Sequence, residues 1–150
     1  MDILNLMQED RKQRQEIVLA NQQLARQFCE KHNLDRVELD FDGSGDSGMI
    51  DDVRYILKGG KEADLHKEPA KHIGVEYNYV KNKSTQTLVE KEGTANDLFE
   101  EVGYNALQAR YSGWEINEGA FGTIFVNHDG SGRIEYNQRI ESTEYSESDF

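Results

Sequence analysis

The chain contains few of the residues that form cross-links, chain breaks or membrane spans. Its 150 residues include one cysteine and one proline, and no apolar run approaches the ~18 residues of a membrane-spanning helix. The lone thiol of Cys29 cannot form an internal disulfide, which favours a reducing compartment. The N-terminus, Met-Asp-Ile-Leu-Asn-Leu-Met, is too short and too acidic for a signal peptide. We therefore expect a cytoplasmic protein that does not bind membranes.

Basic residues are also scarce. The chain has 17 Lys and Arg against 29 Asp and Glu, a formal net charge of -12. Nucleic acids and anionic membranes bind clustered Lys and Arg, so this balance argues against direct nucleic-acid binding. The acids concentrate in residues 32–52, with seven acids and one base, and in an acidic C-terminal tail, residues 141–150, with four acids and no base. Such charge permits a cation or a protein partner with a basic surface.

Apolar spacing predicts a single α+β domain over residues 1–150. Hydrophobic residues make up 36% of the chain, below the ~45–50% typical of soluble domains, which predicts a small core. Helical periodicity over 8–32 and 94–111 predicts two amphipathic helices, and Thr94 and Asp97 have the spacing of a capping box. Alternation predicts three hairpins, over 36–57, 73–91 and 123–137. The expected fold is a two-layer sandwich, an antiparallel sheet of hairpins with both helices on one face.

Residues 41–48 read Phe-Asp-Gly-Ser-Gly-Asp-Ser-Gly and predict an elaborate loop between strands 36–42 and 49–57. Its Gly-Asp-Ser-Gly string also occurs around protease nucleophiles, but the chain offers no fitting His base or scaffold for that chemistry. The spacing partly matches a calcium-binding EF-hand loop, which takes side-chain oxygens at alternate positions and Gly at the sixth. The candidate metal ligands are Asp40, Asp42, Ser44 and Asp46. Asp, Gly and Ser are equally the residues of ordinary turns, so a structural role stays open.

A second motif, Gly-Trp-Glu-Ile-Asn-Glu-Gly-Ala-Phe-Gly, spans residues 113–122. Glu115 and Glu118 could act as a general acid and base if the fold brings them near Asp42 or Asp46. A surface turn in which Trp114 covers the core would have the same sequence. A catalytic pair and a structural turn therefore both remain open.

The two motifs together, with the preceding helix and a C-terminal Ser-Glu-Ser-Asp-Phe, resemble small acidic proteins of bacteria, plasmids and phages that form a domain of unknown function. The resemblance covers residues 10–57 and 95–150 and implies a shared fold. It brings no activity, cofactor or catalytic residue. Residues 60–92 are longer here, so we expect the hairpin at 73–91 to be an insertion. Occurrence on mobile elements favours a role in phage–host or plasmid–host conflict.

Two functional hypotheses follow. The first is a non-enzymatic acidic protein-binding module, an inhibitor that blocks a nucleic-acid-processing or defence protein through Coulombic docking. Its expected contact residues are Asp42, Asp46, Asp51, Asp52, Trp114, Glu115 and Glu118. The alternative is a small metal-dependent or carboxylate-based enzyme, or a calcium-binding protein, centred on the Asp-Gly-Ser loop at 40–51. We expect no cofactor under the first hypothesis, and a homodimer formed through an open sheet face is left open.

Overall fold

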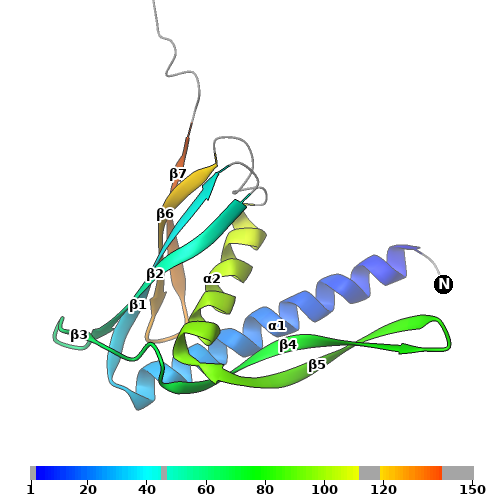
Figure 1. Cartoon of the computed structure of the whole chain (residues 1–150), viewed down its shortest axis with the longest axis horizontal. Coiled ribbons are helices and arrows are strands. Elements are labelled where there is room, and N and C mark those ends of the chain that lie inside the picture. Colours follow the sequence, from blue (N-terminus) through cyan, green and yellow to red (C-terminus); the bar gives the residue numbers. More distant parts are fainter. Residues whose placement is uncertain (1–2, 45–46, 112–118, 140–150) are drawn as a thin grey trace, which may run out of the picture.

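The computed structural model describes residues 3–44, 47–111 and 119–139, and it has the α+β architecture that the sequence predicts. The main antiparallel sheet has the strand order β3-β2-β1-β6-β7, and β4 and β5 form a separate two-stranded sheet (Figure 1). In chain order the elements are α1 (Ile3–Lys31), β1 (Leu34–Ser44), β2 (Ser47–Leu57), β3 (Glu62–Ala63), β4 (Pro69–Val80), β5 (Lys83–Thr94), α2 (Ala95–Arg110), β6 (Ala120–Asn127) and β7 (Gly132–Gln138).

The core lies between the sheet and the two helices. Phe28 of α1, Tyr55 of β2 and Phe99 of α2 are all buried. The ring of Phe99 packs edge-on against Phe28 at 5.6 Å and against Tyr55 at 5.7 Å between centroids. Edge-to-face pairs add about 0.5–1.5 kcal/mol each beyond the burial of their area. These three rings therefore join both helices to the sheet.

The last residue of α1 and the first residue of α2 lie where local chemistry favours a helix end. After α1, Asn33 adopts the left-handed conformation (φ 56), which a helix C-terminus commonly places on Gly or Asn. Before α2, the Thr94 side chain accepts from the Asp97 backbone N–H, and the Asp97 carboxylate accepts from the Thr94 N–H, a complete capping box. Cys29 is fully buried, and burial raises the pKa of its thiol to about 12. The thiol is therefore a packing group.

The predicted loop at 43–48 was wrong. The β1–β2 ladder continues through Gly43 paired with Gly48 and Ser44 paired with Ser47, so the two strands extend into the predicted loop from both sides. Gly and Ser are poor strand formers, but they do not prevent pairing next to a turn, and a hairpin turn needs only two residues. A bulge between Asp40 and Phe41, with Asp51 as the extra residue of β2, interrupts the ladder.

The middle hairpin extends over β4 and β5, three to four residues beyond each predicted end. It is a ribbon that runs beside α1 and projects from the sheet in the same direction as the N-terminal half of that helix (Figure 1). Asn21 of α1 fastens it: its Nδ2 donates to the carbonyl oxygen of Ile73 at 3.0 Å, and its Oδ1 accepts from the Ile73 N–H at 2.7 Å. Whether the ribbon is an insertion stays a prediction. In the described part of the chain, neither helix has the length and apolar character needed to cross a membrane.

Candidate functional site

The main sheet has one face packed against the helices and one face turned away from them (Figure 1). Along β1, Val37, Leu39 and Phe41 are buried in the core, so the residues between them point to the opposite side. Side chains paired directly across neighbouring strands share a face. The outer face, as we call it, therefore comprises Glu38, Asp40, Asp42, Met49, Asp52, Arg54, Phe121, Thr123, Phe125, Arg133 and Glu135.

Arg54 is the centre of the charges on the outer face. Its guanidinium binds both carboxylate oxygens of Asp40, at 2.6 and 3.1 Å, and also Asp52 at 2.8 Å and Glu38 at 3.2 Å. Thr123 donates a further hydrogen bond to Asp40 at 2.8 Å. The hydrogen bonds from Arg54, and secondarily the one from Thr123, hold the pKa of Asp40 below its usual range. These acids are therefore engaged with partners inside the protein.

A second cluster lies nearer the 45–46 connection. Arg139 donates to the Asp42 carboxylate and to the Gly43 carbonyl oxygen, both at 3.0 Å. The same guanidinium lies over the Phe121 ring at 4.9 Å from its centroid. Met49 and Phe121 flank Asp42 on the neighbouring strands and are 59% and 42% exposed. An exposed methionine, an exposed aromatic ring and an arginine thus surround one carboxylate.

The predicted contact residues fall into three groups. Asp42 and Asp52 lie on the outer face, each bound to an arginine. Asp51 lies at the bulge beside them, is exposed, and has no ion-pair partner in the described part of the chain. The remaining predicted residues, Asp46, Trp114, Glu115 and Glu118, lie outside the described residues, so the predicted meeting of the two motifs stays a prediction.

The calcium alternative depends on Asp40, Asp42, Ser44 and Asp46. The carboxylates of Asp40 and Asp42 already bind Arg54 and Arg139, and the side chains of Ser44 and Asp46 are not among those described. Within residues 3–44, 47–111 and 119–139, no three His, Cys, Asp or Glu side chains form a group able to hold a metal ion. Calcium binding stays an untested prediction.

The second motif ends at Gly122, and the close packing around this residue explains why it is a glycine. A Cβ at this position would meet the backbone carbonyl oxygen of Glu135 in β7, with the Phe41 ring 3.1 Å away. Only glycine lets β6 and β7 approach this closely above Phe41. This part of the motif is therefore structural.

The family described as "Family of unknown function (DUF6878)" matches residues 17–150. The chain belongs to this family. The match includes both Gly-rich motifs and agrees with the resemblance to a domain of unknown function. It also includes the β4–β5 ribbon, which lies outside the residues that the resemblance covers. No curated protein and no solved structure matches the chain.

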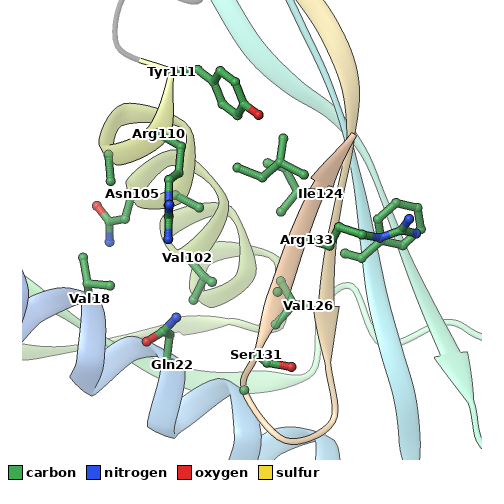
Figure 2. A pocket seen from close by; sticks show the side chains of 16 residues that line it. Val18, Gln22, Val102, Asn105, Arg110, Tyr111, Ile124, Val126, Ser131 and Arg133 are labelled. Carbon is green, nitrogen blue, oxygen red and sulfur yellow. The ribbon is translucent and has the colours of Figure 1, made fainter. Parts of the chain in front are cut away.

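This member of DUF6878 also has a cavity that no motif indicated. It measures about 460 Å³ and lies between α1, α2 and the β6–β7 hairpin, on the helix-covered side of the sheet (Figure 2). Of its lining residues, Val102, Ile124 and Val126 are buried, whereas Ala109 and Arg110 are exposed, and we call the part that these two residues line its mouth. Its lining comes from three elements far apart in the chain, so no local sequence pattern could have predicted it.

Proposed function

We propose that the protein is a non-enzymatic protein-binding module that docks through its outer face. The observation that carries this proposal is the exposed cluster of Met49, Asp42, Phe121 and Arg139 on a sheet face that the helices leave uncovered. Methionine, aromatic residues and arginine are enriched in the cores of protein interfaces. A few such anchors supply most of the binding energy in known complexes.

The charge of the chain favours a basic partner. The formal net charge is -12, and Asp51 presents an exposed carboxylate beside the cluster that no described residue neutralises. Coulombic attraction of this kind increases the association rate and is screened by salt over about 8–10 Å. A protein that binds nucleic acids presents a suitable surface of Lys and Arg. We propose such a nucleic-acid-processing or defence protein as the partner, with the module acting as its inhibitor.

The test is capture by the tagged full chain from nuclease-treated lysate of the source organism, followed by residue-specific cross-linking. We expect one stoichiometric partner that cross-links to residues of the outer face, elutes at high salt and loses nucleic-acid binding on capture. A partner that retains its nucleic-acid binding would refute inhibition and leave docking intact. Cross-links confined to the ribbon would refute the docking face itself.

Matched variants separate the cluster from general charge effects. Asp51→Lys and Met49→Ser change the proposed face. Glu76→Lys and Tyr79→Ser make comparable changes on the ribbon, an acid to lysine and an exposed apolar side chain to serine, where both residues are exposed. We expect capture to fall at least tenfold for the first pair, as hot-spot losses of about 2 kcal/mol imply, and to stay within about twofold for the second. Equal losses in both pairs would contradict a docking site on the outer face.

A further inference from the structure

The cavity between α1, α2 and the β6–β7 hairpin has the dimensions of a small-molecule site. Its volume of about 460 Å³ is within the ~300–1,000 Å³ of known ligand pockets. The floor consists of the side chains of Val102, Ala106, Ile124 and Val126, and Tyr111, stacked on Tyr136 at 3.8 Å between centroids, lies at one end. Such a floor is suited to an apolar ligand body.

The electrostatic character of the cavity differs from that of the rest of the molecule. The chain is rich in Asp and Glu, yet among the residues that the structure describes no acid lines the cavity, whereas Arg110 and Arg133 do. The Arg133 side chain extends away from α2 (Figure 2). On the outer face it lies over the Phe125 ring at 4.4 Å and pairs with Glu135. The guanidinium of Arg110 is at the mouth and has no ion pair or hydrogen bond within the described ranges. The cavity therefore offers one positive charge, that of Arg110, which no carboxylate of the described lining neutralises.

A buried polar group is further evidence for a ligand site in this cavity. Asn105 lines the cavity, and its Nδ2 is buried with no hydrogen-bond partner among the residues that the structure describes. Leaving a buried donor unpaired is unfavourable, so such groups in folded proteins usually have a partner. An acceptor on a molecule inside the cavity would satisfy it. Figure 2 shows Asn105 and Arg110 on α2, with Val18 and Gln22 of α1 on the adjoining wall.

We propose that this cavity binds a small organic carboxylate with an apolar body. Arg110 pairs with the carboxylate, the Asn105 amide donates a hydrogen bond to it, and the apolar body lies on Val102, Ile124 and Val126. A carboxylate fits better than a phosphate because phosphate sites combine several cationic groups or backbone N–H groups. Among the described residues, Arg110 is the only side-chain cation at the mouth.

The experiment is a titration of the isotope-labelled full chain with octanoate, observed by NMR. Octanamide, which has the same apolar body and a neutral head group, and octylamine, with a cationic one, are titrated in parallel. We expect octanoate to shift the Asn105 side-chain NH₂ signals and the backbone amides of Val102 and Ile124, and to bind about tenfold more tightly than octanamide, the gain of one charge-assisted hydrogen bond. Equal affinity for octanoate and octanamide, or shifts confined to the ribbon, would overturn the proposal.

Variants then test the two proposed contacts. Arg110→Gln is expected to weaken octanoate about tenfold while leaving octanamide unchanged. Arg11→Gln removes the same charge from an exposed position of α1 that does not line the cavity, and should bind octanoate like the unaltered chain. Ala109→Trp, at the exposed mouth, should block every ligand of the series. An unchanged octanoate affinity in both Arg110→Gln and Ala109→Trp, with folding verified by circular dichroism, would place the site elsewhere.

Discussion

Replacement of Asn21 by alanine should detach the β4–β5 ribbon from α1. Asn21 is the one polar side chain among the described residues that is fully buried, and its amide makes both hydrogen bonds that a neighbouring strand would make to Ile73. Ile73 faces Glu90 in the β4–β5 ladder, yet both of its backbone polar groups bind the helix. The amide of Asn21 thus substitutes for a strand at the edge of the ribbon.

The expected loss in stability can be estimated from these contacts. Two hydrogen bonds contribute about 1 kcal/mol each, and the Ile73 groups left unpaired cost about 1 kcal/mol more, at the low end because Ile73 is only half-buried. Alanine recovers about 0.5–0.7 kcal/mol through its higher helix propensity. The free energy of unfolding of Asn21→Ala should therefore fall by about 2 kcal/mol.

The assay is equilibrium unfolding in urea, with hydrogen exchange of the Ile73 amide as the local readout. Gln23→Ala, at an exposed position of the same helix, is the control and should stay within about 0.5 kcal/mol of the unaltered chain. Faster hydrogen exchange at the Ile73 amide in Asn21→Ala, and not in Gln23→Ala, would confirm that Asn21 protects this amide directly. If Asn21→Ala were as stable as Gln23→Ala, the two hydrogen bonds between Asn21 and Ile73 would not stabilise the fold as we have argued.

Two further predictions concern the outer face and the second motif. Arg54 lowers the pKa of Asp40. Their pairing therefore stabilises the fold above the unfolded pKa of about 4, and this stabilisation is lost as the pH falls through the lower folded pKa. Arg54→Met should reduce the free energy of unfolding by about 1 kcal/mol near pH 7 and by less near pH 3, measured by thermal unfolding. Gly122→Ala should lose about 2–3 kcal/mol in urea because its Cβ meets the backbone of Glu135. In Gly74→Ala the Cβ meets only the flexible end of Lys91, at 2.9 Å, so a loss below about 1 kcal/mol is expected, and equal losses would contradict the steric argument.

The sequence predicted those parts of the fold that depend on short-range chemistry. The predicted end of the first helix at residue 32 and the predicted capping box at Thr94 and Asp97 each depend on residues close together in the chain, and the structure places the helix end at Lys31 and contains the capping box. The strand ends at 43–48 were misjudged, because glycine and serine signal a turn but not how many residues form it. The role of Asn21 was also missed, since a polar residue beside an apolar stripe does not reveal a bonding partner 52 positions away.

The candidate site was harder to predict because its charged side chains pair with residues far away in the sequence. Asp42 was expected to be a free docking group, yet it binds Arg139, 97 positions further along the chain. Asp40 likewise accepts from Thr123, 83 positions away. Counting acids along residues 32–52 identified where negative charge accumulates, but it could not identify which carboxylates the sheet pairs with arginine. Of the predicted contact residues that the structure describes, Asp51 is exposed and has no ion-pair partner in the described ranges, and its role in docking stays a prediction.

Strand β6 contributes to both proposed sites, and its alternation makes them separable. Phe121 and Thr123 point to the outer face, whereas Ile124 and Val126 point to the cavity on the opposite side. A substitution at Met49 therefore changes the docking cluster without reaching the cavity, and Arg110→Gln changes the cavity without reaching the cluster. If Met49→Ser abolished partner capture and left octanoate binding intact, while Arg110→Gln did the reverse, the two faces would act independently. Loss of both activities in either variant would instead mean that the sheet couples the two faces. Substitutions at well-separated residues usually have independent effects on free energy, whereas substitutions of residues in contact or in one network do not.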